Sequence, residues 1–278
     1  MPSFDTPEPV SVTLEFDIGT VRITAGERAD TVVDVRPSDA AQENDVRDAE
    51  RTRVTCTREK LLVRGPKNRS LFGRSGSVDI TIGLPAGSHV RAEAAVGDLL
   101  CEGRLGDLGL RVSAGDIQVA EARSATVKSG YGTVRVDAVD TDADVSGSDR
   151  VHVGRVGGTA TVTNHNGETT VGEVVGELRA RSANGRITVA VAHAGVDARS
   201  ANGSITVGEV ARGQVALRTT AGKVEVGIRE SSAAWLDVDT RLGKVHQALE
   251  PVDGPHASEE TVRVRARTGL GDIVVRRA

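Results

Sequence analysis

Residues 178–195 read LRARSANGRITVAVAHAG, and residues 196–210 continue as VDARSANGSITVGEV, so the chain repeats nearly the same sequence after 18 residues. Arg-Ser-Ala-Asn-Gly occurs at 181–185 and again at 199–203, each time followed by Ile-Thr-Val. Self-similarity at a short fixed period is typical of solenoids and other repeat architectures. The repeat therefore predicts the fold before any single residue does.

The repeat extends in both directions from its two glycines, Gly185 and Gly203. Between Gly97 and Gly222 the anchor position recurs every 17 to 19 residues, and it then loosens to steps of 21 and 28 residues. Upstream, Gly76 lies 21 residues before Gly97 and is interpreted as one more anchor. The anchors are Gly97, Gly115, Gly132, Asp149, Gly167, Gly185, Gly203, Gly222, Gly243 and Gly271. We expect the coils to stack in this chain order.

Small or apolar residues alternate with polar ones on both sides of each anchor, which is the pattern of a strand with one buried face. Asn-Gly between such strands is also the strongest short hairpin signal, so an antiparallel meander is the alternative fold. Repetition of the whole unit favours stacked coils instead. We predict an all-β, single-stranded parallel β-helix of about 18 residues per coil, and right-handed winding because parallel crossovers turn that way.

The composition fits a narrow coil, because aromatic residues make up 2% of a chain that holds 32 glycines. A thin core admits Val, Ile, Leu and Ala but few rings. A column of small hydroxyl residues precedes the anchors and is predicted to line a tight corner, where it can bond to the backbone. Its members are Ser129, Ser182, Ser200, Thr219, Thr240 and Thr268.

Residues 76–278 are predicted to form one continuous solenoid domain, and residues 1–75 an irregular set of first coils that caps it. Within that cap we expect a strand at 31–35, a short helix or loop at 38–51 and a hairpin from 53–57 and 61–64. The glycine-rich basic loop at 65–76 lacks the order of a phosphate-binding loop and is interpreted as a surface loop.

The run SGSVDITIGLPAGSHVRAEAAVGDL at 75–99, followed by many Gly-x-(Val/Ile)-x-Val units, resembles the bacterial "putative adhesin" β-strand-repeat family. That family is a domain of unknown function with a β-helical fold. The resemblance implies the fold and an adhesion or scaffold role, and it supplies no catalytic residue.

The charge balance is mild, with a net charge of −4 and a pI near 5.9. This makes a nucleic-acid partner unlikely on composition, because dedicated nucleic-acid binders are usually strongly basic. The sequence shows no secretory signal and no run long enough to span a membrane, so a cytoplasmic location is expected, with surface association left open. Cys56 and Cys101 are predicted to be unpaired reduced thiols.

Catalytic and metal chemistry find little support in the sequence. The six histidines occupy different repeat positions, and Gly-Asp recurs without the nonapeptides of a calcium-binding roll. No metal and no cofactor are predicted. The alternative to a non-catalytic scaffold is a carbohydrate-active β-helix enzyme of the polysaccharide lyase or hydrolase type, which would need carboxylates converging on one groove. Asp142 and Asp144 are close in sequence, and we interpret this i, i+2 pair as a solvated strand face.

One outward column is mostly basic. Four residues before the anchors lie Arg111, Lys128, Thr163, Arg181, Arg199, Arg218 and Arg267. Stacked coils would place neighbouring members about 4.8 Å apart. Such a row either is a solvated stripe neutralised by acids such as Asp197 and Glu225, or binds a linear anionic partner, an acidic polymer or an acidic protein surface. The predicted site residues are Arg111, Lys128, Arg181, Arg199 and Arg218.

Two segments break the period near the C-terminus. Residues 231–235 contain the single tryptophan, Trp235, which is either a binding aromatic or, as we favour, a cover for a thinly packed part of the core. Residues 247–260 hold two prolines and several acids and are predicted to form an exposed loop, where repeat proteins often place recognition.

Overall fold

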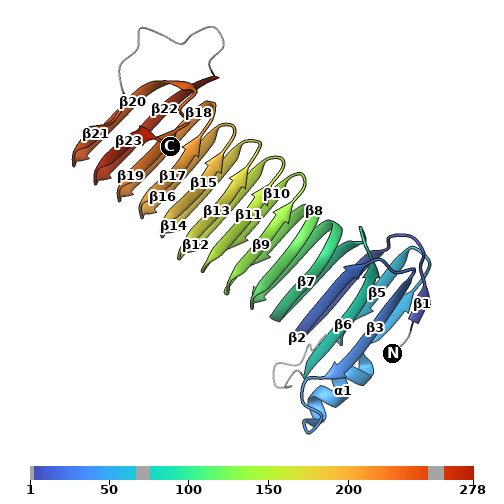
Figure 1. Cartoon of the computed structure of the whole chain (residues 1–278). Coiled ribbons are helices and arrows are strands. Elements are labelled where there is room, and N and C mark those ends of the chain that lie inside the picture. The colour runs from blue at the N-terminus through green and yellow to red at the C-terminus, as the bar shows by residue number, and fades with distance from the viewer. Residues whose placement is uncertain (1–2, 67–75, 250–259) are drawn as a thin grey trace. The chain divides into compact units, whose positions relative to one another are not determined.

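A computed structural model of the chain describes residues 3–66, 76–249 and 260–278. Most of them lie in β-strands, and the chain divides into two compact units, residues 1–139 and 140–278. Each unit is a stack of parallel coils, so the prediction of an all-β parallel solenoid is confirmed (Figure 1).

Unit 2, residues 140–278, builds each coil from two main strands on different faces. The first strands are β10 (Ala143–Gly147), β12 (Ala160–Asn166), β14 (Leu178–Asn184), β16 (Val196–Asn202) and β18 (Gly213–Ala221). The second strands are β11 (Val151–Val156), β13 (Thr169–Val174), β15 (Ile187–Ala192), β17 (Ile205–Val210) and β19 (Val224–Ile228). Equivalent strands pair in parallel, which rules out the hairpin alternative for these segments.

The alternation in the sequence becomes an inside and an outside. Ala180 and Ala198 are fully buried, whereas Arg181 and Arg199, which directly follow them, are exposed. Because a coil this narrow encloses small side chains, no coil buries enough surface alone and each depends on its neighbours.

The anchor glycines turn the chain where coils stack most closely. Gly185 has φ +145°, and a Cβ atom added there would lie 1.8 Å from the carbonyl oxygen of Gly167 in the next coil. The hydroxyl column closes the same corner: Thr219 donates to the carbonyl oxygen of Gly203 at 2.8 Å, and Ser200 to that of Gly185 at 3.2 Å. The predicted bonding of this column to the backbone is therefore confirmed at these positions.

Asparagines form a second ladder beside the glycines. Nδ2 of Asn184 donates to Oδ1 of Asn166 at 3.1 Å, and Nδ2 of Asn202 donates to Oδ1 of Asn184 at 2.9 Å. The repeated Asn-Gly thus serves two purposes, since the glycine permits the corner and the amide binds one coil to the next.

The C-terminal coils do not stack in chain order, which corrects the predicted sequence of anchors. Strand β22 (Glu260–Leu270) pairs with β18 on one side and with β20 (Ser232–Leu242) on the other. Likewise β23 (Ile273–Arg277) lies between β19 and β21 (Val245–Gln247). The last coil of the chain is inserted one place inward, and the coil that precedes it is outermost.

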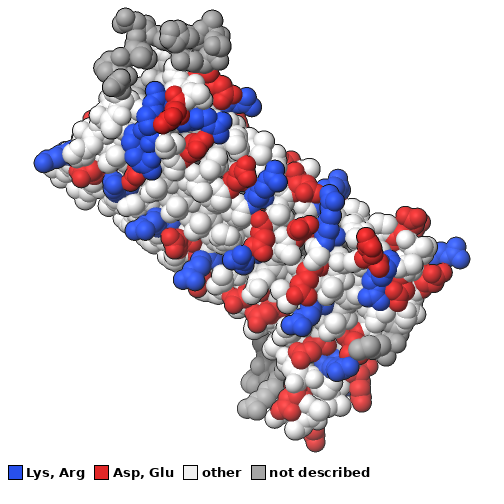
Figure 2. All heavy atoms as spheres, in the orientation of Figure 1, with Lys and Arg blue, Asp and Glu red and all other residues white. Residues whose placement is uncertain are grey.

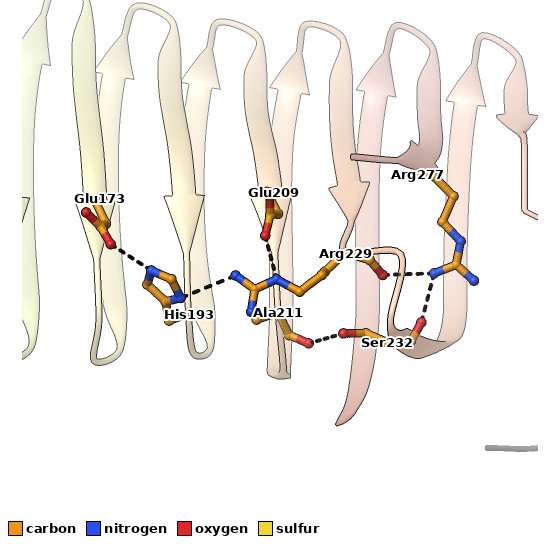
Figure 3. Close-up of polar contacts among 7 residues, drawn as sticks. All are labelled: Glu173, His193, Glu209, Ala211, Arg229, Ser232 and Arg277. Atoms are coloured by element: carbon orange, nitrogen blue, oxygen red, sulfur yellow. Dashed lines mark hydrogen bonds and ion pairs between the residues drawn. The ribbon is translucent and has the colours of Figure 1, made fainter. Parts of the chain in front are cut away.

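A polar network holds the turn that carries the chain past the inserted coil (Figure 3). Arg277, on β23, donates to the carbonyl oxygens of Arg229 at 3.0 Å and Ser232 at 2.8 Å. The Arg229 side chain in turn bonds Glu209 at 2.5 Å and approaches Nδ1 of His193 at 3.3 Å. The network ties the inserted coil to the loop around it, so we interpret it as structural.

Unit 1, residues 1–139, also contains a coil that is inserted out of chain order. Strand β2 (Ser11–Gly26) lies between β7 (His89–Ala114) and a coil made of β5 (Lys60–Arg64) and β6 (Ser77–Pro85). Gly19 stacks directly against Gly97 and Val78, so the interpretation of Gly76 as an anchor is wrong. Beyond β7 the stack continues through β8 (Ile117–Ser129) and β9 (Val134–Val139).

Antiparallel elements cover the first coil of unit 1. Strand β3 (Asp30–Pro37) pairs with β6 and β4 (Arg53–Cys56) with β5, while β1 (Ser3–Asp5) pairs with β3. Helix α1 (Glu43–Arg51) precedes β4. The predicted strand, helix and hairpin of this region are confirmed, and the antiparallel strands cover the open ladder.

The two cysteines are free, Cys101 buried and Cys56 partly exposed, in agreement with the predicted unpaired thiols. Burial raises the pKa of Cys101 to about 12. No helix among the described residues is long and apolar enough to cross a membrane. Most of the 65–76 loop and of the 247–260 segment lies outside the described residues.

Candidate anion-binding face

The basic column of unit 2 is built by strand register. Arg181, Arg199 and Arg218 are direct partners on β14, β16 and β18, with Thr163 of β12 on one side. Their side chains point outward because their positions alternate with buried residues along each strand. The structure therefore brings together the three arginines that the sequence predicted, one per coil at the ladder spacing of about 4.8 Å.

Insertion of the β22 coil lengthens the row. Chain order would place Asp239 of β20 between Arg218 and Arg267, but Arg267 pairs directly with Arg218 and Asp239 follows it. The arginine row, defined as Arg181, Arg199, Arg218 and Arg267, thus occupies four consecutive coils. No sequence signal indicated this adjacency, because it depends on which coil is outermost.

Acidic side chains neutralise alternate members of the arginine row. Arg199 forms a bidentate ion pair with Asp197, in which Nε donates to Oδ1 at 2.9 Å and Nη2 donates to Oδ2 at 3.1 Å. Arg267 bonds Oδ1 of Asp237 at 2.6 Å. Among the described residues, Arg181 and Arg218 have no ion pair.

Of the two acids predicted to neutralise the arginine row, one does so. Asp197 acts as expected, but Glu225 bonds Lys223 at 2.8 Å and Arg276 at 3.1 Å on the other face of the coil. Asp237, which the sequence analysis did not single out, accepts bonds from both Arg267 and Arg265. The hydrogen bond from Arg267 holds the pKa of Asp237 below its usual value, so this carboxylate stays charged beside the row.

A shallow groove of about 930 Å³ adjoins the arginine row. Its wall includes Arg179 and Asp197, which precede row members by two residues, and Gln214 of β18. Arg212 and Glu260, which also line the groove, bond each other at 3.1 Å, whereas Glu177 has no ion pair among the described residues. A partner bound to the arginine row could therefore extend sideways into this groove.

In unit 1 the predicted residues Arg111 and Lys128 are also direct partners, on β7 and β8. They border a groove of about 520 Å³ over Gly109, whose missing side chain leaves the hollow open. Acids line the same groove: Glu93 pairs with Arg91 at 3.2 Å, and Asp107 pairs with Arg123. Arg111 and Lys128 are thus a pair of basic residues in unit 1. Among the predicted site residues, a row of three, Arg181, Arg199 and Arg218, occurs in unit 2.

Trp235 is exposed over 63% of its surface, so the favoured interpretation of it as a core cover is wrong. It points outward from β20, opposite Arg263 of β22. Figure 2 shows basic and acidic side chains interspersed over the visible face, with basic groups gathered near the C-terminal coils. Strand β22 alone contributes Arg263, Arg265 and Arg267 there.

Acidic residues after the anchors serve the backbone. Oδ1 of Asp116 accepts the N–H of Thr133 at 2.7 Å, and Oδ1 of Asp272 accepts that of Lys244 at 2.8 Å. The described part of the chain contains no cluster of three or more His, Cys, Asp or Glu residues that could hold a metal ion. The Gly-Asp pairs therefore have a structural explanation.

The stacked parallel coils define the chain as a β-solenoid protein. It belongs to the Toastrack family, since the model of the Toastrack DUF4097 family matches residues 11–276. The resemblance noted for residues 75–99 is thereby confirmed at the level of the fold and the family.

Two solved structures are similar over nearly the whole chain. A "putative cell adhesion protein" from Clostridium sporogenes is 10% identical, with 99% of this chain and 94% of that chain covered and a TM-score of 0.28. A "putative adhesin" from Bacteroides fragilis is 13% identical, with 99% and 95% covered and a TM-score of 0.39. No curated protein matches the sequence.

Proposed function

We propose that this protein is a non-catalytic binding scaffold whose arginine row holds an acidic partner. The observation that carries the proposal is the run of four arginines in consecutive coils, two of which lack an acidic partner among the described residues. Like charges stacked on a ladder repel each other. A partner with negative charge along a line would relieve that repulsion.

The partner is proposed to be a linear anionic polymer or an acidic protein surface. Guanidinium groups bind carboxylate and phosphate through two parallel hydrogen bonds, and Arg181 and Arg218 are exposed and free to do so. They lie two coils apart, a separation of roughly 10 Å along the stack. The weakly acidic whole chain argues against a dedicated nucleic-acid binder.

The grooves favour binding over glycoside cleavage. A hydrolase needs one carboxyl group with a raised pKa to protonate the leaving group. In the unit 1 groove the hydrogen bond from Ser124 lowers the pKa of Asp107 instead. In the unit 2 groove Asp197 and Glu260 are both bonded to arginines. Asp107 therefore lacks the raised pKa that the reaction requires, and Asp197 and Glu260 lack the unpaired geometry of a general acid.

The test replaces Arg181, Arg199 and Arg218 together by Glu. Fluorescence anisotropy with labelled poly-L-glutamate and with polyphosphate should show salt-dependent binding to the wild type and none to the variant. A matched control, R150E/R186E/K244E, changes the net charge by the same amount at exposed positions outside the row. Equal binding by the row variant and the wild type would contradict the proposal, as would failure of the wild type to bind either polymer.

The proposal carries the expectation of a cytoplasmic location. A pull-down from the producing cells, with the row variant as the comparison, identifies the partner. Fractionation of the same cells assigns the compartment, and recovery in the surface fraction would replace the cytoplasmic expectation.

A further inference from the structure

The outermost coil of unit 2 presents an open sheet edge. Within the described residues β20 pairs with β22 alone and β21 with β23 alone. The inward residues of β20 are half-buried, whereas their partners Val262, Val264 and Ala266 on β22 are fully buried. The described residues therefore cover the core incompletely at this end of the stack, which β20 and β21 form (Figure 1).

The backbone of β20 leaves bonds unmade along that edge. The carbonyl oxygen of Leu242 accepts the N–H of Gly271 in the β22 coil at 2.9 Å. Because successive residues of a strand direct their polar groups to opposite sides, the backbone groups of Asp239 and Arg241 face away from β22. The carbonyl oxygen of Asp237 already accepts a hydrogen bond from Nη1 of Arg267 at 3.0 Å. Strand β20 contains no proline or glycine that would discourage pairing. In unit 1, by contrast, antiparallel strands β3 and β4 cover the corresponding edges.

We propose that this edge binds a second copy of the chain, with the two β20 strands antiparallel about a two-fold axis at Thr240. In that register Asp239 of each copy lies opposite Arg241 of the other, and each such pair exchanges two backbone hydrogen bonds. Both side chains are exposed and have no ion pair among the described residues. The contact therefore contains two new opposite-charge pairs.

Neighbouring registers are electrostatically worse. A two-fold axis at Val238 would place Asp237 of one copy opposite Asp239 of the other. An axis at Asp239 would place the two copies of Asp239 opposite each other, and an axis at Arg241 would do so for the two copies of Arg241. Like charges directly opposite each other destabilise a strand pair. The charge pattern of β20 thus selects the register centred on Thr240.

The same register covers apolar surface. Leu242 is 68% exposed, and the proposed pairing places it opposite Val238 of the second copy, whose side chain is half-buried. Covering these groups completes the partly open core at the end of each stack. This interface is separate from the proposed function, since it requires no member of the arginine row.

Sedimentation velocity and light scattering over a concentration series test the proposal on the full chain. We expect a dimer for the wild type. D239R and R241D each turn both opposite-charge pairs into like-charge pairs, which should weaken the dimer by at least about tenfold. The double variant D239R/R241D restores opposite charges and should restore the dimer. T220R, on the interior strand β18, is the control for an added outward charge.

Each outcome is decisive. A wild type that stays monomeric at high concentration overturns the proposal, as does a dimer that both single variants leave intact. Weakening by the single variants without recovery in the double variant overturns the register centred on Thr240. Circular dichroism and thermal melting of every variant verify that the terminal coil remains folded.

Discussion

At the scale of single residues, the amide ladder shows how one repeated position joins successive coils. Asn184 takes part in two amide hydrogen bonds, one with Asn166 and one with Asn202, whereas Asn202 takes part in one. Beyond Asn202 the next coil carries Ala221 at the same position, so the ladder ends there. The contribution of each asparagine should follow its number of bonds.

We predict that N184A lowers the free energy of unfolding by roughly 1–2 kcal/mol and N202A by about half as much, because a net hydrogen bond contributes about 1 kcal/mol. Urea denaturation of both variants measures the difference. A183S changes the neighbouring exposed position and should leave stability nearly unchanged. Equal losses in the two asparagine variants would show that the ladder does not act as a chain of separate bonds.

At the scale of elements, the displaced order of the coils depends on the turn between β19 and β20. That turn must carry the chain past the β22–β23 coil, and Arg277 fixes it through two backbone carbonyl groups. Bonds from a charged donor to such groups are stronger than neutral ones. The polar network of Figure 3 therefore stabilises the turn on which this stacking order depends.

We predict that R277A destabilises the terminal coils by about 1.5–3 kcal/mol, the usual range for hydrogen bonds of charged groups. Hydrogen exchange should accelerate at residues 229–247 before it does so in the interior coils. R276A is the matched control, since Arg276 pairs with the part-exposed Glu225 and its loss should cost at most about 1 kcal/mol. Uniform exchange along unit 2 in R277A would refute a local role for the network.

At the scale of the whole molecule, stability should fall in acid. Hydrogen bonds from Lys223 and Arg276 lower the pKa of Glu225, and Arg267 and Arg265 lower that of Asp237. A carboxyl group with a depressed folded pKa stabilises the protein above its unfolded pKa, and that stability is lost as the pH falls through the folded value. The relevant unfolded values are 4.5 for Glu225 and 3.8 for Asp237.

We therefore predict a melting temperature that is flat near neutral pH and declines below about pH 4.5. In E225Q/D237N the melting temperature should be lower at pH 7 and the decline below pH 4.5 shallower. E177Q, at an exposed residue without an ion pair in the described part of the chain, should follow the wild type. A pH profile unaffected by E225Q/D237N would mean that other groups govern acid unfolding.

From the sequence alone follow the 18-residue period, the buried and exposed alternation, the hydroxyl corner and the register of Arg181, Arg199 and Arg218. These are local consequences of a repeat, because equivalent residues in successive coils must meet on a parallel ladder. The sequence also predicted the strand at 31–35 and the hairpin from 53–57 and 61–64, since their patterns break the period.

Only the tertiary structure decided which coil lies next to which at the two ends of the chain. All coils present the same ladder, so β22 can pair with β18 as well as β20 does, and β2 can enter between β6 and β7. That choice rests on long-range connections and on contacts such as those of Arg277. The order of the coils placed Arg267 in the arginine row, left Trp235 exposed and made β20 the open edge. The sequence could not determine this order, because a repeat specifies the contact between coils but not which coils are neighbours.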